Sequence, residues 1–539
     1  MKTRNKGIIF FALVAGIMLA SGITIAIPGK EAEDNDLEVF VVGDGYTDEE
    51  RPQFCGTNDK AKSTDFVTEF KIPTACTQPL AITTEPNGTV WFAQTNTGNI
   101  AKFDPLTEKF TEYTNSRWVD AESQLKYKLR SMMWGMDYSP DGAIWYTDEA
   151  TDSIWRFSIA DETYNTINFP ISEDISSLPQ KLVIDGSNVI VNDFTGGKLT
   201  IFGFSQQGEL SYASIPSALD GFTSDFTIDS ENNIWYTNWN SDGTGILIKF
   251  NYKEWESQLS ISSQADSGLF LQDFIQFFQF PSGMTAPNGV SVGPNQNIWI
   301  VDTTSSYFFS FDPVTEEFTK YVTSVPTIDS YGNASGFIKS PISRPYWIEH
   351  SGNNLVMNEQ TANRIGVFNP STETLVEYTI PSRNPNWSDC EGIEYCGVAQ
   401  VFDFAIDGKK IWFTEWVENN IGVVDTSIPL PFSIDIDTKE ITLEKGETTV
   451  VTLQVTSNRS MVSALELLLP TNVNYSTTST FSDITIKPEL NDFSLLSEVT
   501  TISVEVAASE HALSGTHKVL LGAYTNDIAI SQFITVTIV

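Results

Sequence analysis

Histidine is almost absent from this chain, since its 539 residues include only His350, His511 and His517. The sequence contains no Gly-x-Ser-x-Gly elbow, no phosphate-binding P-loop and no His-Glu-x-x-His motif. None of its cysteine and histidine spacings is typical of zinc. Each of these sites needs particular residues at fixed spacing, so their absence disfavours a nucleophile-elbow hydrolase, a P-loop nucleotide-binding protein and a zinc protein.

Basic residues are also scarce. There are 31 lysines and arginines against 69 acidic residues, which gives a formal net charge of −38. Such a charge repels phosphate backbones and anionic lipid headgroups, so a nucleic-acid partner is excluded. The same charge keeps a secreted surface soluble and attracts cations.

Long apolar runs are missing except at the N-terminus, where Lys2, Arg4 and Lys6 precede an uncharged stretch over residues 7–27. About 20 apolar residues suffice to span a bilayer, and the basic flank stays inside. Residues 1–28 therefore predict a signal peptide or a transmembrane anchor. We favour the anchor, although Ala20-Ser21-Gly22 would suit cleavage. The acidic residues 29–63 then form a linker, and the rest is extracellular or at the cell surface.

Cysteine is rare and even in number, and all four residues fall in expected loops. An exported chain with four cysteines predicts two disulfides, and three pairings are open. We prefer the pairing with the shortest loop, Cys390–Cys396, together with Cys55–Cys76.

What the sequence does contain is a repeat. Residues 79–113 read as four short strands, in which Asn87-Gly88 and Asp104-Pro105 supply tight turns. A four-stranded unit of about 40 residues that recurs is typical of a β-propeller blade. Seven such units follow one another. The position that Trp91 holds in the first unit recurs in the second strand of each unit, as Trp91, Trp145, Ile190, Trp235, Trp299, Val356 and Trp412.

The predicted fold is therefore all-β, with a seven-bladed propeller over residues 64–427. Blade seven lacks a fourth strand after Val424-Asp425, whereas Phe66–Ile72 resembles the fourth strands of other blades. We expect that segment to complete blade seven and close the ring. Residues 428–539 contain no tryptophan or cysteine, and their alternating Ser/Thr/Val/Ile strands predict an immunoglobulin-like β-sandwich.

Acids or amides occupy the end of the second strand in every blade: Gln94, Asp148, Asp193, Asn238, Asp302, Glu359 and Glu415. We call these seven residues the collar. Two interpretations are open. They cap their strands by bonding to loop amides, or they form a polar ring on one propeller face that binds a ligand or a cation such as Mg²⁺ or Ca²⁺.

The blades resemble the virginiamycin B lyase (streptogramin lyase) family of seven-bladed propellers, over about residues 65–427. The motifs that carry the resemblance are GxVWFxQ…NIAKFDP, GxIWYTD…SIWRF, ANRIGVFNP and IWFTEWxxNNIGVVD. The resemblance implies metal-assisted opening of a cyclic depsipeptide by catalytic histidines that begin the first strands of the last two blades, with a glutamate nearby. This chain has Tyr346 and Phe402 at the histidine positions and Gln400 at the glutamate position.

The N-terminal stretch predicts an exported, membrane-tethered protein, and these departures predict a binding or interaction protein without the lyase chemistry. Its partner is an unknown ligand or a cell-envelope protein at the propeller face. The alternative is an enzyme, either a metal-assisted lyase or a lactone hydrolase that uses the carboxylates of the collar.

Overall fold

The structure is a computed structural model that describes residues 60–118, 132–149, 151–169, 177–204, 210–216, 221–240, 242–261, 271–326, 342–383, 400–458, 472–479, 483–490, 492–494 and 499–539. No helix within these ranges is long and apolar enough to cross a membrane. The expected anchor and most of the acidic linker lie outside them, as do Cys55, Cys390 and Cys396. Cys76 is buried, and no cysteine in the described part is free. Because the other three cysteines lie outside the described ranges, the disulfide pairing stays a prediction.

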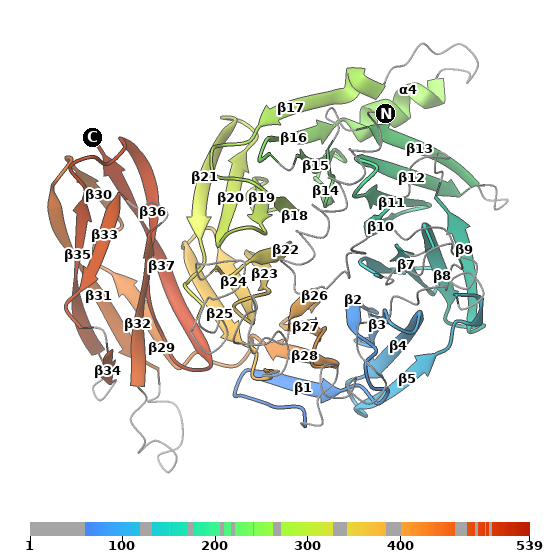
Figure 1. Cartoon of the computed structure of the whole chain (residues 1–539), viewed down its shortest axis with the longest axis horizontal. Coiled ribbons are helices and arrows are strands. Elements are labelled where there is room, and N and C mark those ends of the chain that lie inside the picture. Colours follow the sequence, from blue (N-terminus) through green and yellow to red (C-terminus); the bar gives the residue numbers. More distant parts are fainter. Residues whose placement is uncertain are drawn as a thin grey trace, which may run out of the picture.

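The N-terminal part is a ring of antiparallel sheets around a central axis (Figure 1). Each blade uses four strands, with the first strand innermost and the fourth outermost. Blade one is β2 (Pro79–Thr84), β3 (Val90–Gln94), β4 (Asn99–Asp104) and β5 (Lys109–Tyr113). Blade two is β6 (Met136–Ser139), β7 (Ala143–Asp148), β8 (Ser153–Ser158) and β9 (Thr163–Asn168). Blade three is β10 (Pro179–Asp185), β11 (Asn188–Asp193), β12 (Lys198–Phe204) and β13 (Leu210–Pro216).

The ring continues through blades four to seven. Blade four is β14 (Phe226–Ile228), β15 (Ile234–Trp239), β16 (Gly245–Phe250) and β17 (Ile275–Gln279), with α4 (Tyr252–Ile261) and the 3-10 helix η1 (Leu271–Phe274) before β17. Blade five is β18 (Pro287–Val292), β19 (Ile298–Asp302), β20 (Tyr307–Asp312) and β21 (Glu317–Val322). Blade six is β22 (Pro345–Ser351), β23 (Asn354–Glu359), β24 (Arg364–Asn369) and β25 (Thr374–Thr379). Blade seven begins with β26 (Val401–Asp407), β27 (Lys410–Glu415) and β28 (Asn420–Asp425).

The fourth strand of blade seven comes from the start of the described chain. β1 (Val67–Lys71) pairs antiparallel with β28, in a register that runs from Val67 opposite Val424 to Lys71 opposite Asn420. The expected closure by both ends of the propeller is thus confirmed. It covers the edge of β28 that would otherwise expose unpaired backbone groups.

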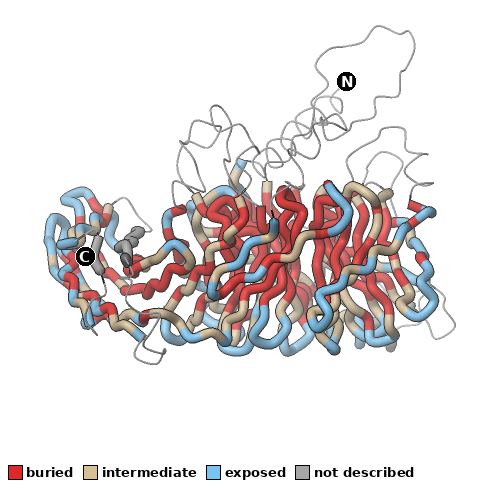
Figure 2. Tube along the Cα trace, turned by 90° about the horizontal axis from the view of Figure 1, so that it is seen from below, coloured by how far each residue is buried: buried red, intermediate tan, exposed pale blue. Residues whose placement is uncertain are grey.

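Apolar side chains fill the space between neighbouring blades. The second-strand tryptophans are buried, and Trp91 packs 5.7 Å from Phe157 of the next blade between ring centroids. In Figure 2 buried residues run through the thickness of the disc, and exposed ones gather at turns. One of those turns contains Gly88 at a φ of +88°, which favours glycine.

Polar side chains also connect the blades close to the axis. Thr414 Oγ1 of blade seven donates to the carbonyl of Leu80 in blade one at 2.7 Å. The innermost strands approach so closely that a Cβ on Gly289 would lie 2.7 Å from the Cα of Trp347. Neighbouring blades are thus joined close to the inner edges of their sheets by a hydrogen bond and by close backbone contact.

The C-terminal part contains two further layers of strand. One is a four-stranded sheet in the order β29 (Phe432–Ile436), β31 (Thr448–Ser457), β35 (Val499–Ala508) and β33 (Ile484–Pro488). The other runs β37 (Ile528–Ile538), β36 (Gly515–Tyr524), β32 (Asn472–Ser479) and β34 (Asp492–Ser494), with β30 (Glu440–Leu443) parallel to β37. We call this part the C-terminal module. Its immunoglobulin-like classification and the boundaries at residues 63/64 and 427/428 stay predictions.

The C-terminal module shares a sheet with the propeller. β37 pairs antiparallel with β25, the outer strand of blade six, from Thr374 opposite Gln532 to Tyr378 opposite Ile528. The result is one nine-stranded sheet (Figure 1). Phe533 of β37 packs against Tyr321 of blade five and Phe368 of blade six, with ring centroids 5.1 and 5.8 Å apart.

Candidate functional site

The collar residues lie inside their blades. All seven are at most 1% exposed. Asp302 accepts the backbone N–H of Thr285, Ala286 and Thr304 at 3.1 Å each. Asp193 similarly accepts the N–H groups of Leu178 and Gly196, so loop amides are bonded as the capping interpretation expects.

Three collar residues reach outward to the fourth strand of their own blade. Gln94 Nε2 donates to Glu112 Oε1 at 2.6 Å in blade one. In blades six and seven the corresponding pairs consist of two acids: Glu359 with Glu377, and Glu415 with Glu69. The described structure therefore brings no open ring of collar side chains to the axis, and a ligand-binding role for them stays a prediction.

Burial raises the pKa of Glu415 well above its usual range, and the charge of Glu69 raises it further, against a hydrogen bond from Asn420. Burial and then Glu377 raise the pKa of Glu359, while Arg364 lowers it. A carboxyl group that retains its proton at neutral pH can donate to a neighbouring carboxylate. Each pair can thus be held together by one shared proton.

The positions that the family resemblance marks as catalytic hold a packed aromatic cluster. Tyr346 of blade six stacks on Trp134 of blade two at 6.1 Å and 12°. Phe402 of blade seven lies edge-on to Trp134 at 5.7 Å and to Tyr346 at 5.9 Å. Trp416 packs on Phe402 at 5.3 Å. We call these four residues the channel plug, because they join blades two, six and seven across the axis.

The channel plug is buried, with exposures of 0–5%. Glu149 accepts the indole N–H of Trp134 at 2.8 Å. Burial raises the pKa of Glu149 to about 8, although the bond from Trp134 lowers it and Asp148 and Asp152 raise it further. Gln400, the third family position, is also buried, at 2% exposure.

Charged side chains on the first strands of several blades meet beside the channel plug. Lys181 Nζ of blade three lies 2.8 Å from Glu349 Oε1 of blade six, and the two side chains are 19% and 35% exposed. Lys181 also lies over the ring of Trp347 at 5.4 Å. Burial alone lowers the pKa of Lys181, but Glu349, Asp225 and Asp403 outweigh it and raise the pKa. The amine therefore stays an ammonium ion.

Asp225 and Asp403 occupy the same place in blades four and seven and make the same bonds. Each accepts the N–H of the next residue, and each also accepts an N–H from a neighbouring blade. That second donor is Val290 for Asp225, at 2.9 Å, and Ile82 for Asp403, at 3.0 Å. Burial raises the pKa of both carboxyls to about 7, against the lowering effect of Lys181.

Asp137 of blade two completes the group. It accepts the N–H of Tyr138 and of Ile184 in blade three, at 2.8 and 2.9 Å. Burial raises its pKa to about 6. We call Asp137, Lys181, Asp225, Glu349 and Asp403 the charge cluster. With one cation against four carboxyl groups, it favours cations and exchanges protons near neutral pH.

Our sequence reasoning missed the charge cluster. A signal was present, because Asp-Phe-x-Ile-Asp occurs at residues 225–229 and again at 403–407, in the first strands of blades four and seven. The first aspartate of this repeat, Asp225 or Asp403, recurs in the strand that lines the channel and could have been predicted as a functional residue. Its partner Lys181 occurs at the corresponding place in one blade alone.

The described side chains do not suit a metal ion. Within the described ranges no group of three or more histidine, cysteine, aspartate or glutamate residues is arranged to hold a metal ion. The family positions Tyr346, Phe402 and Gln400 supply two aromatic side chains and an amide, which are poor ligands for Mg²⁺. The described residues at the family positions therefore do not fit a divalent metal ion.

No protein-family model matches the chain, and no curated protein matches it. Among solved structures it is similar to the selenomethionine-substituted virginiamycin B lyase from Staphylococcus aureus, at 20% identity and a TM-score of 0.48, over 67% of this chain and 98% of that one. A streptogramin B lyase structure matches at 18% identity and a TM-score of 0.47, over 66% and 96%. A regucalcin from Agrobacterium tumefaciens matches at 12% identity and a TM-score of 0.34, over 54% and 89%.

Identities this low say nothing of activity, and the propeller itself follows from the strand pairing. The resemblance that the blade motifs indicated is confirmed to this extent: the chain is similar to the propellers of the virginiamycin B lyase type.

Proposed function

We propose that this chain is an exported, membrane-tethered binding protein that lacks the lyase chemistry of the propellers it resembles. One observation carries the loss of chemistry. Tyr346 and Phe402 replace the expected histidines and are packed against Trp134 across the channel. General acid–base catalysis needs a titratable group within reach of the substrate. Phe402 has no such group, and burial raises the pKa of the Tyr346 hydroxyl well above its usual value, so that hydroxyl is a poor base at neutral pH.

The described histidines support the proposal. His350 is exposed near the end of β22, where its ring nitrogen lies 2.7 Å from the Gly352 carbonyl. His511 and His517 belong to the C-terminal module. None of the three lies at the channel plug.

The proposed absence of lyase activity is tested with purified protein lacking residues 1–28. A cyclic depsipeptide of the streptogramin B type is incubated with it and Mg²⁺, and ring opening is followed by mass spectrometry. We expect no opening above a protein-free control. Opening that is lost on Tyr346→Ala or Glu149→Gln substitution would overturn the proposal.

Export and tethering are inferred from the N-terminal sequence. Cells producing the full chain and cells producing the chain without residues 1–28 are fractionated and treated with an external protease. The full chain should be found with the membrane and be cut from outside, and the shortened chain should be found inside. The full chain in the soluble cell interior would contradict tethering.

An enzyme remains the second candidate, and the charge cluster favours it. Burial raises the pKa of Asp225 and Asp403 to about 7, which suits proton transfer at neutral pH. Lactones would be offered with Mg²⁺ or Ca²⁺. Hydrolysis that falls at least tenfold with Asp403→Asn, at unchanged thermal stability, would favour the enzyme over the binding protein.

A further inference from the structure

Three blades hold a cation against their second-strand tryptophan. Directly opposite the tryptophan, the third strand carries Lys102, Arg156 or Lys249. The charged groups lie 5.7 Å from the Trp91 ring, 5.9 Å from Trp145 and 5.3 Å from Trp235. A cation over an aromatic face is attracted by the electron-rich ring.

A second ring from the fourth strand completes the arrangement in blade one. Tyr113 stacks with Trp91 at 5.5 Å, and Lys102 lies 5.5 Å from Tyr113 as well. The ammonium is thus shared by two rings. We call the place over the third strand that borders both the second-strand tryptophan and the fourth-strand ring the aromatic slot.

Blade five receives its cation from another part of the chain. Ser310 stands opposite Trp299 and is too short to supply a charge. Lys518 of the C-terminal module places its ammonium 5.8 Å from the ring of Tyr321, the fourth-strand ring of this blade. Glu373 also contacts Lys518, with 2.5 Å between nitrogen and oxygen. An aromatic slot can therefore be served by a lysine from outside its blade.

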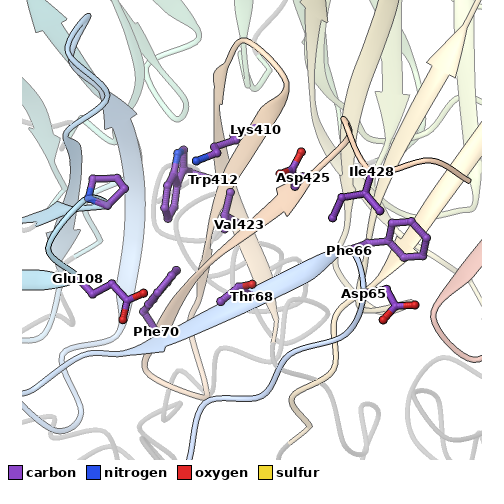
Figure 3. A pocket seen from close by; sticks show the side chains of 11 residues that line it. Asp65, Phe66, Thr68, Phe70, Glu108, Lys410, Trp412, Val423, Asp425 and Ile428 are labelled. Carbon is purple, nitrogen blue, oxygen red and sulfur yellow. The ribbon is translucent and has the colours of Figure 1, made fainter. Parts of the chain in front are cut away.

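Blade seven has the two rings without a cation opposite the tryptophan. Trp412 and Phe70 lie 6.1 Å apart, and Val423 stands opposite Trp412 where blade one has Lys102. A cavity of about 260 Å³ lies here, lined by Thr68, Phe70, Trp412 and Val423 among others. Figure 3 shows these side chains on three adjacent strands of the blade.

The margin of this cavity is acidic. Asp65, Glu108 and Asp425 line it, against one cation, Lys410. Hydrogen bonds from Ser427 hold the pKa of Asp425 below its usual range, so that carboxyl group is ionised at neutral pH. The indole N–H of Trp412 has no hydrogen-bond partner in the described part, whereas those of Trp91 and Trp235 donate to Glu85 and Asp229.

We propose that the aromatic slot of blade seven binds an alkylammonium or guanidinium group from another molecule, as a lysine or arginine side chain would present it. The cation takes the place that Lys102 holds in blade one, over Val423 and against the rings of Trp412 and Phe70, with the carboxylates at its margin. The cavity is lined by β1, the outermost strand of blade seven, and by none of the residues of the charge cluster or the channel plug, so the proposal stands independently of the channel.

The test follows the Trp412 indole signal in protein labelled with ¹⁵N-tryptophan, at low ionic strength. Its signal is assigned as the one that disappears in Trp412→Phe. The probes are acetyl-Ala-Lys-Ala-amide, its uncharged norleucine analogue and cadaverine. We expect a saturable shift with the lysine peptide and none with the norleucine peptide. A cadaverine shift assigns the slot to the free amine too, and its absence restricts the slot to peptides.

Two variants make the result specific. Val423→Lys fills the slot with its own ammonium and should abolish the shift, and Asp425→Asn should weaken binding about two- to five-fold. The matched control is Val367→Lys, which places the same residue opposite Val356 in blade six and should leave binding unchanged. Thermal melting checks that all three variants fold. An equal response to the norleucine peptide, or unchanged binding by Val423→Lys, would overturn the proposal.

Discussion

Lys181 and Glu349 face each other across the propeller, from blade three and blade six, with 2.8 Å between ammonium nitrogen and carboxylate oxygen. More than 160 residues separate them in sequence. Asp225 and Asp403, which also act on Lys181, belong to two further blades. One ammonium ion thus stabilises acids on the inner strands of several blades.

Replacing Lys181 with methionine should destabilise the propeller at pH 8. Breaking a fully buried ion pair costs about 3–5 kcal/mol. Because Glu349 is about a third exposed, we expect about 2 kcal/mol, measured by urea unfolding. At pH 5 the loss should shrink, since Asp225 and Asp403, with pKa values of about 7, hold protons there.

The matched variant is Glu349→Gln, which removes one acid and leaves Lys181 beside Asp225 and Asp403. It should cost less than Lys181→Met at pH 8. An equal loss for Lys181→Met at pH 5 and pH 8 would show that packing, and not charge, explains the effect.

Glu415→Gln should stabilise the protein at pH 8. The pKa of Glu415 is raised in the folded state, so between the ordinary glutamate pKa and the raised one the folded protein binds more protons than the unfolded chain. Stability therefore falls as pH rises through that window. Glutamine removes this dependence and can donate to Glu69, as Gln94 donates to Glu112.

We expect a gain of about 1 kcal/mol at pH 8 and little change at pH 4, measured by thermal and urea unfolding. Gln94→Glu is the reciprocal control, because it creates a third acid pair and should lower stability at pH 8. If the loss of stability between pH 4 and pH 8 were the same in Glu415→Gln as in the wild type, Glu415 and Glu69 would not share a proton.

Trp134→Ala should cost about 3–5 kcal/mol, the range for truncating a buried aromatic residue. Trp134 is 2% exposed and contacts both Tyr346 and Phe402. Tyr346→Phe keeps the ring stack and should cost less than about 1 kcal/mol. If Trp134→Ala were equally mild, the channel plug would not contribute to holding the blades together.

Deleting residues 60–72 should lower the melting temperature of the propeller by about 10 °C or more, because blade seven loses β1 and its edge is exposed. Thr68→Ala, at an exposed position of the same strand, should change it little. Calorimetry distinguishes the two. An unchanged melting temperature after the deletion would mean that the ring is stable with a three-stranded blade.

The repeat made the blades predictable, because each carries the same alternation, turns and tryptophan position. Closure was predictable as well, since a strand was missing at one end and present at the other. The outward direction of the collar follows from a rule that we did not apply. Side chains two apart share a sheet face, so Gln94 lies on the same face as Val90 and Phe92, where it reaches Glu112 on the fourth strand of the same sheet.

The charge cluster depends on information that no single blade contains. Lys181 is one of three polar residues in its strand, and its role appears only when blades three, four, six and seven are closed around one axis. The aromatic slot of blade seven was hidden for a similar reason. Val423 is an ordinary strand residue until it is compared, strand by strand, with Lys102.

The pairing of β37 with β25 determines how the chain would respond to mechanical tension. Pulling on β1 at one end and on the C-terminal module at the other loads blade seven and blade six, which are neighbours in the ring. Phe66 of blade seven touches Tyr378 of blade six at 5.7 Å, beside both junctions. Because residues 426–431 join blade seven directly to β29, the load reaches the module through this backbone link and through the β25–β37 pairing together, and blades one to five contain neither connection.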